Sequence, residues 1–255
     1  MIPLQGKRII VTGGASGIGR AVALIVARFG ATVAVFDRDA RGGEAVVEEI
    51  RGGGNARFWS VDISDDRAVD AVVDTATAWM GGLDVLLHVA GIIQGTMADI
   101  DDLTTDTWNR VIDVNLSGSF FVARAAARVM KKAGHGVIVL TSSGAGVTGG
   151  SASIAYAPSK GGVHGLTMAL AMHLGKYGIR VNDVCPGKVD TPMVTAGREE
   201  VLRFTGRRPA PPQPDGSGSP FLYEGNLSSP EGVAEIYAFL ASDAADYVHG
   251  SIFTR

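Results

Sequence analysis

The sequence predicts an α/β protein of one domain, in which helices cover both faces of a parallel sheet. Short runs rich in Val, Ile and Thr alternate with longer helical patterns along nearly the whole chain, over short connections. Most of these runs are apolar throughout, as in strands that are buried on both faces. No break in composition marks a second domain, and no internal repeat occurs. We therefore expect a three-layer α/β/α arrangement over residues 1–255.

The predicted elements follow one another in a regular order. Strands are expected at residues 7–12, 32–36, 56–61, 84–89, 136–141 and 179–184, with a short candidate at 251–255. Helices are expected at 20–29, 41–51, 65–80 and 104–132, then from about 153–155 onwards, and finally after Ser229. Gly30 suits the C-cap of the first helix, and Ser64 is the expected N-cap of the third.

One segment, residues 195–229, departs from this alternation because it holds several prolines and a Gly/Ser-rich tract. A long irregular segment inside a compact domain is either a functional lid or disordered. Arginines in or near it would attract an acidic substrate, or are simply solvated. They are Arg198, Arg203, Arg207 and Arg208.

Composition excludes several classes of function. The net charge of −3 gives no basic footprint for nucleic acid. No apolar run approaches the 18 residues or so of a membrane span, and no signal peptide begins the chain, so we expect a cytoplasmic protein. Cys185 is the single cysteine, which leaves no internal disulfide and no thiol-rich metal site. We expect a buried thiol there and no bound metal.

A glycine-rich turn between the first strand and the first helix predicts a nucleotide site. Glycine lets backbone amides approach a pyrophosphate at the positive end of the helix. Asp37 closes the second strand at about the expected distance, and its carboxylate would bind the ribose hydroxyls and repel a 2′-phosphate. NAD is therefore favoured over NADP, although Arg38 would accommodate the phosphate. The turn residues expected at the cofactor are Gly13, Ser16, Gly17, Ile18 and Gly19.

Tyr156 and Lys160 lie four residues apart, on one face of a predicted helix. A nearby ammonium favours the phenolate of a tyrosine, whose ordinary pKa is about 10. Pro158 belongs in a first helical turn, which places Tyr156 near the helix N-terminus, where the macrodipole also favours negative charge. An ordinary surface pair is the alternative reading, and the nucleotide motif favours the catalytic one.

With the glycine turn, Asp37 and the Ser143/Tyr156/Lys160 set in view, the chain resembles the short-chain dehydrogenase/reductase family over nearly its whole length. The resemblance implies a Rossmann-type, doubly wound domain of about seven parallel strands, assembled as a homotetramer or homodimer. It also implies hydride transfer between a nicotinamide cofactor and a secondary alcohol or ketone.

The resemblance assigns roles to individual residues. Tyr156 would be the general base or acid, and Lys160 would lower its pKa and bind the nicotinamide ribose. Ser143 would donate a hydrogen bond to the substrate oxygen; it is preferred over Ser142 because it precedes Tyr156 by thirteen residues. Asn115 would hold a water that links Lys160 to solvent.

Further contacts follow from the same resemblance. Asp62 and Ile63 match the adenine-contacting pair, and the remaining cofactor candidates are Ala90, Gly91, Pro186, Gly187, Val189 and Thr191. The substrate pocket would add to Ser143 and Tyr156 the residues Gln94, Ser153, Gly187 and Met193. In the family, the segment that corresponds to residues 193–229 folds over the substrate as a lid.

The chain departs from the family pattern at two further places. His88-Val89 replaces the asparagine pair that follows the fourth strand, and we expect a buried structural histidine rather than a catalytic one. The chain stops at Arg255, without the family's Asp-Gly-Gly tail. Two alternatives stay open: an NADPH-dependent 3-oxoacyl (carrier protein) reductase, which a strong preference for NADPH would favour, and a non-catalytic nucleotide-binding regulator, which these departures suggest. The intact Asn/Ser/Tyr/Lys set opposes the second.

Overall fold

The computed structural model describes residues 3–149, 151, 153–205 and 228–254. Within them, seven strands form one parallel sheet in the order β3-β2-β1-β4-β5-β6-β7. The expected doubly wound, Rossmann-type sheet is confirmed. The strands are β1 (Arg8–Thr12), β2 (Thr32–Asp37), β3 (Asn55–Ser60), β4 (Val85–His88), β5 (Gly136–Thr141), β6 (Ile179–Cys185) and β7 (Ile252–Thr254).

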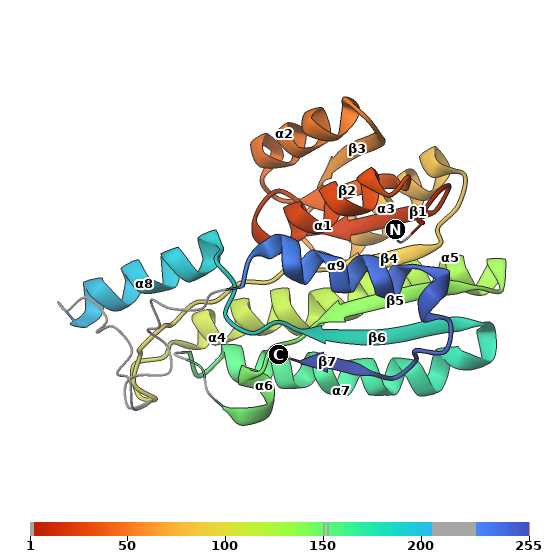
Figure 1. Ribbon diagram of the computed structural model, residues 1–255. Coiled ribbons are helices and arrows are strands. Elements are labelled where there is room, and N and C mark those ends of the chain that lie inside the picture. The colour runs from red at the N-terminus through yellow and green to blue at the C-terminus, as the bar shows by residue number, and fades with distance from the viewer. Residues whose placement is uncertain (1–2, 150, 152, 206–227, 255) are drawn as a thin grey trace.

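Helices cover both faces of this sheet (Figure 1). The α-helices are α1 (Gly17–Arg28), α2 (Ala40–Arg51), α3 (Asp66–Met80), α4 (Thr105–Ile112), α5 (Gly118–Ala133), α6 (Ala145–Thr148), α7 (Tyr156–Leu174), α8 (Pro192–Thr205) and α9 (Pro230–Ala241). Shorter helical turns are η1 (Asp113–Ser117), η2 (Gly175–Tyr177) and η3 (Asp243–Ala245).

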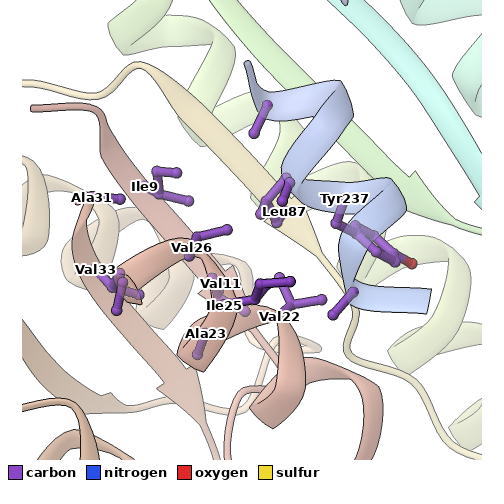
Figure 2. Close-up of a cluster of buried hydrophobic side chains, with 14 of the residues drawn as sticks. Ile9, Val11, Val22, Ala23, Ile25, Val26, Ala31, Val33, Leu87 and Tyr237 are labelled. Carbon is purple, nitrogen blue, oxygen red and sulfur yellow. The ribbon is translucent and has the colours of Figure 1, made fainter. Parts of the chain in front are cut away.

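Two apolar cores lie on opposite faces of the sheet. On one face, β1 contributes Ile9 and Val11 to a cluster shared with α1, α2 and α9; on the other, Ile10 meets α3, α5 and α7. This alternation follows from the two-residue period of a strand. Figure 2 shows part of the first cluster, in which side chains of β1, β2 and α1 lie near Leu87 of β4 and Tyr237 of α9.

The helix predicted at residues 104–132 is one helical stretch with a break in its register. A π-turn, η1, separates α4 from α5, and the amide of Gly118 donates to the carbonyl oxygen of Asp113, five residues back. Such π-turns are frequent at functional sites. The apolar pattern did not reveal it, because the extra residue shifts the phase of the pattern only once, while the helical period is the same on either side.

The start of α3 differs from expectation. Asp65, rather than Ser64, is the N-cap of α3; its carboxylate accepts from the amides of Arg67 and Ala68. Ser64 instead donates its hydroxyl to Asp62 at 2.6 Å. By contrast, Ser229 caps α9 as the Ser-Pro-Glu pattern predicts, accepting from the amide of Gly232.

The predicted irregular segment begins with a helix that the sequence pattern did not indicate. α8 extends outwards beyond the carboxyl ends of the strands (Figure 1). Its apolar residues are too scattered to give a helical pattern. Residues 206–227 of the expected lid, together with Arg207 and Arg208, lie outside the described residues, as do the side chains of Arg198 and Arg203.

Candidate active site

The site lies at the carboxyl ends of the parallel strands, where the strand order reverses between β1 and β4. Ligands of doubly wound sheets bind at this switch point. A cavity of about 570 Å³ opens there. The expected residues that line it are Gly13, Ser16, Gly17, Ile18, Gly19, Asp37, Arg38, Asp62, Ile63, Ala90, Gly91, Gln94, Ser143, Tyr156, Lys160, Pro186, Gly187, Val189, Thr191 and Met193.

The glycine turn brings backbone very close to backbone. A Cβ on Gly19 would overlap the carbonyl oxygen of Gly13, and one on Gly13, whose φ is +68°, would lie 2.8 Å from the amide of Ala90. Within the described chain, the amides of residues 17–19 have no acceptor, and the first helical bond runs from Arg20 to Ser16. These free amides at a helix N-terminus fit a pyrophosphate.

Asp37 is held rigidly at the ribose end of the cavity. One carboxylate oxygen accepts from the amide of Ala15 and the other from the amide of Asp39, each at 3.0 Å. Asp39 also lines the cavity, while Arg38 is exposed. Two carboxylates, those of Asp37 and Asp39, therefore border this part of the cavity.

Asp62, which also lines the cavity, is ionised and held in place. Burial alone would raise the pKa of its carboxyl, but hydrogen bonds from Ser64 and the guanidinium of Arg110 outweigh burial and lower it. Arg110 comes from α4 and also lines the cavity.

Tyr156 is the first residue of α7, as Pro158 predicted. The hydroxyl of Ser143, from the loop after β5, is hydrogen-bonded to the phenol. The Nζ of Lys160 lies 5.9 Å from the centre of the Tyr156 ring and donates to the carbonyl oxygen of Thr141 at 2.7 Å. The three side chains that the sequence singled out thus meet at one end of the cavity.

The expected lowering of the tyrosine pKa is not what this arrangement gives. Burial raises the pKa of Tyr156, and the hydrogen bond with Ser143 offsets it only in part. Burial also lowers the pKa of Lys160 to about 8, against the attraction of Asp183. The expectation was wrong for the protein without its cofactor. The sequence pattern places an ammonium beside the phenol, but it does not show that burial removes water from both groups and so disfavours both charges.

Asn115 sits in the π-turn, fully buried, and does not line the cavity. Its side chain accepts from the amide of Ile92 at 2.8 Å and donates to the Ile92 carbonyl oxygen and the Ser159 hydroxyl, each at 2.9 Å. Gly91 fits between it and the catalytic helix: a Cβ there would lie 3.2 Å from Nζ of Lys160 and 3.3 Å from Oδ1 of Asn115. The asparagine therefore joins the loop after β4 to α7.

A family profile described as short chain dehydrogenase matches residues 7–201. The chain belongs to the short-chain dehydrogenase/reductase family. A cis-4-hydroxycyclohexanecarboxylate dehydrogenase of Sinomonas cyclohexanicum is 41% identical over 95% of this chain and 92% of its own length. A cyclopentanol dehydrogenase of Comamonas sp. (strain NCIMB 9872) is 37% identical over 97% of this chain and 94% of its own.

A solved structure agrees with this assignment. The crystal structure of a putative NAD(P)-dependent gluconate 5-dehydrogenase from Beutenbergia cavernae, with NADP bound at low occupancy, is 36% identical, with a TM-score of 0.83 over 99% of this chain and 96% of its own. The chain is therefore an NAD(P)-dependent oxidoreductase that acts on CH–OH groups, transferring hydride between a secondary alcohol and the cofactor.

In this short-chain dehydrogenase, Ser142 and Ser143 have different surroundings. Ser142 is 2% exposed; its amide donates to Oδ1 of Asp183 at 2.9 Å, and its hydroxyl lies 3.3 Å from Nδ1 of His164. The hydroxyl of Ser143 instead meets Tyr156. This geometry favours Ser143, as the spacing does.

Ser153, an expected substrate contact, is not among the residues that line the cavity of the dehydrogenase. It is 1% exposed, and its hydroxyl donates to the carbonyl oxygen of Gln94 at 2.6 Å and accepts from the amide of Tyr156 at 3.2 Å. It ties the Gln94 loop to the first turn of α7. The family resemblance placed it at the pocket; in the structure its hydroxyl already has two backbone partners.

The cavity also includes residues that sequence reasoning missed. They are Phe36, Asp39, Val61, Val89, Ile92, Ile93, Arg110, Val114, Thr141, Pro192, Val194 and Ala196. Four of them, Phe36, Val61, Val89 and Thr141, are the last residues of predicted strands, which is the signal that would have found them. His88 and Cys185 are buried, as expected. The described residues include no helix long and apolar enough to cross a membrane and no cluster of metal-ligating side chains.

Proposed function

We propose that this dehydrogenase oxidises a cyclic secondary alcohol with NAD, using Tyr156 as the general base. The observation that carries the proposal is one continuous cavity, with Ser143, Tyr156 and Lys160 at one end and the glycine turn and Asp37 at the other. The relatives named for cyclohexanol and cyclopentanol derivatives support the substrate class.

Each catalytic group has a distinct part in the reaction. Bound NAD supplies the acceptor for the hydride of the carbinol carbon. Tyr156 takes the hydroxyl proton, and the Ser143 hydroxyl donates to the oxygen as its bond to carbon gains double-bond character. The ammonium of Lys160 stabilises the phenolate form of Tyr156. Asn115 positions the loop and helix that carry these groups, and a water near it would return the proton to solvent.

The preference for NAD rests on the ribose end of the cavity. Asp37 and Asp39 both border it, and a 2′-phosphate would add about two negative charges beside them. Arg38 is the group that would favour NADP, and a related structure holds that cofactor. The two fixed backbone contacts of Asp37 argue that its carboxylate does not swing away to admit a phosphate.

The substrate end of the cavity is mainly apolar. Ile92 and Ile93 from the loop after β4, and Met193 and Val194 from α8, surround the space beside the catalytic groups. Such walls suit a hydrocarbon ring that carries one hydroxyl. Gln94 adds a polar side chain.

A panel of alcohols, run with NAD and with NADP in parallel, tests the proposal. Cyclopentanol and cis-4-hydroxycyclohexanecarboxylate are expected to be oxidised with kcat/KM at least about tenfold above that of 2-butanol, and NAD is expected to exceed NADP by a similar factor. Tyr156→Phe is expected to abolish turnover while leaving NAD affinity near normal. Turnover retained in that variant would contradict the assignment, and a preference for NADP would overturn the cofactor.

Two alternatives are less well supported. The matched relatives are alcohol dehydrogenases by name, which does not favour a 3-oxoacyl (carrier protein) reductase. The meeting of Ser143, Tyr156 and Lys160 opposes a purely regulatory protein.

The higher-order features of the enzyme are also proposals. Exposed apolar side chains on α4, α5 and α7 support a homo-oligomer, a tetramer or a dimer; they include Trp108, Phe120, Met168 and Met172. One domain spanning residues 1–255 agrees with the single sheet, and α8 would begin the lid of residues 193–229. The cytoplasm, where nicotinamide cofactors are plentiful, is the proposed location.

A further inference from the structure

His88 is the last residue of β4 and is completely buried. Its Nδ1 lies 2.8 Å from the hydroxyl of Thr12 at the end of β1. Its Nε2 lies 2.9 Å from the hydroxyl of Ser119 in the first turn of α5. Both ring nitrogens therefore have a partner, and each partner belongs to a different element.

The donor and the acceptor in each hydrogen bond of His88 follow from counting the protons that its partners carry. The hydroxyl of Ser119 has one proton, and it goes to the carbonyl oxygen of Asn115 at 2.5 Å. Nε2 of His88 must therefore be the donor to Ser119. At the other end, the Thr12 oxygen accepts from the amides of Val89 and Ala90, at 3.2 and 3.3 Å, and its own proton points to Nδ1.

The imidazole is thus neutral and protonated on Nε2. A proton added to Nδ1 would face the hydrogen of Thr12, and no acceptor would remain for it. Burial, and then the charge of Lys160, lower the pKa of His88 to about 3. The other polar groups at the ring, on β1 and α5, are uncharged hydroxyls.

The chain of hydrogen bonds continues from His88 to the catalytic helix. Asn115, whose carbonyl oxygen receives the Ser119 proton, donates from Nδ2 to the hydroxyl of Ser159 at 2.9 Å. Ser159 in turn donates to the carbonyl oxygen of Tyr156 at 2.7 Å. A continuous path therefore joins the loop under the cofactor, through the π-turn, to the first turn of α7.

We infer that His88 is a positioning residue of the dehydrogenase reaction. Its Nε2–H tautomer holds the π-turn and, through Asn115, the first turn of α7 with Tyr156. Through Thr12, it keeps both in a fixed position relative to Val89 and Ala90, which line the cofactor site. An asparagine at this position would reach Thr12 with its oxygen, where Nδ1 now lies, but would be too short to reach Ser119. The inference rests on the proposed function for its kinetic consequence, and on geometry alone for its tautomer.

The tautomer is tested on the cofactor-free protein. With all five histidines labelled with ¹⁵N, the long-range ¹H–¹⁵N spectrum is expected to show one ring, absent in His88→Asn, as the Nε2–H tautomer from about pH 5 to about pH 9. Ser119→Ala is expected to shift the same signals, which identifies them even where the His88 variant does not fold. An Nδ1–H ring, or one that titrates in that range, would overturn the inference. This readout stands whether or not the proposed substrate is correct.

The kinetic test compares His88→Asn, Ser119→Ala and the double variant. Each single change is expected to lower kcat on the order of tenfold, with KM for NAD changed less than about twofold, because the glycine turn and the Thr12 contacts remain. The double variant is expected to match the worse single variant, since both break the same path. Effects that multiply, or losses confined to KM for NAD, would overturn it.

Thr167 gives a matched control for Ser119. It is fully buried in α7, and its hydroxyl also donates to the carbonyl oxygen four residues back, that of Val163. Thr167→Val is expected to lower the unfolding midpoint as Ser119→Ala does while leaving kcat within about twofold. An equal loss of kcat in this control would show that Ser119 and His88 contribute only to the stability of the fold, and it would overturn the inference.

Discussion

Tyr156 must lose its proton before it can accept one from an alcohol, and burial opposes that loss. Its pKa is raised by burial, with only partial relief from the hydrogen bond with Ser143. Burial lowers the pKa of Lys160 to about 8, so a substantial fraction of Lys160 is neutral at about pH 8. In the protein without its cofactor, the phenolate of Tyr156 and the ammonium of Lys160 are therefore both less favoured than the spacing of the two residues on the helix suggests.

This balance predicts the pH dependence of the reaction. A base whose pKa is raised is more fully deprotonated as the pH rises, so kcat/KM for alcohol oxidation is expected to increase from about pH 6 to about pH 9. Ketone reduction, which needs the phenol, is expected to stay nearly constant over the same range, because a tyrosine whose pKa is raised above about 10 keeps its proton there. The oxidation slope is expected to stay below tenfold per pH unit, because Lys160 loses charge above about pH 8.

Initial rates in both directions, with NAD affinity measured at each pH, check this expectation. Nearly constant affinity would assign the change to the chemical step. An oxidation rate that is flat or falls across the range would show that Tyr156 is not the titrating base.

At the scale of elements, an ion pair fixes the start of two central strands. Asp84, just before β4, accepts from the Nε, the NH2 and the backbone amide of Arg8 at 2.6–2.8 Å, and lies 3.1 Å from Nε2 of His135. Burial alone would raise the pKa of Asp84, but these bonds bring it down to about 2. The pair lies at the amino ends of β1 and β4, opposite the ends that border the site, so its effect is expected on stability.

Asp84→Asn is expected to lower the free energy of unfolding by about 2 kcal/mol at neutral pH, because the contacts of the folded state hold the pKa of the Asp84 carboxyl at about 2, below its ordinary value. Because the folded pKa is below the unfolded one, the contribution is complete above about pH 4 and is lost as the pH falls towards about 2. Urea unfolding of both proteins across this range measures it.

Glu48→Gln is the matched control, since Glu48 pairs with Arg51 on the surface of α2 with 75% of its side chain exposed. Its effect is expected to stay below about 1 kcal/mol. A penalty for Asp84→Asn that persists unchanged at the lowest pH would show that the carboxylate charge is not its source.

At the scale of the whole molecule, the surface of α7 and its neighbours is unusually apolar. Met172 is 84% exposed, and Met168 lies one helical turn before it. Phe120 of α5 and Trp108 of α4 add to this exposed area, and both helices contact α7. Clustered exposed apolar side chains mark interaction surfaces.

Met172→Glu is therefore expected to lower the mass of the enzyme in solution, as a charge at an apolar interface has no partner. Light scattering after size-exclusion chromatography measures the change. Tyr247→Glu is the control, because Tyr247 is fully exposed but lies outside α7, in the loop after η3. A monomeric wild-type enzyme, or dissociation caused by the Tyr247 change instead, would contradict the assignment of the interface to α7.

The sequence by itself determined the parallel sheet, the order of its elements and most of the cavity wall. Buried strands are apolar throughout, and glycines are placed where backbone must meet backbone, so both features are local and readable. The start of α7 followed from Pro158, because proline acts on its own turn. These properties depend on residues close together along the chain.

Only the tertiary structure decided which polar groups meet and how burial changes them. The hydroxyl of Ser153 is bonded to two backbone groups, and Asn115 lies in a π-turn and does not line the cavity. The pKa of Tyr156 is raised rather than lowered. His88 receives its tautomer from Thr12 and Ser119, which lie 76 and 31 residues away along the chain. Hydrogen bonds between distant residues and the loss of solvent are properties of packing, which a pattern of nearby residues does not carry.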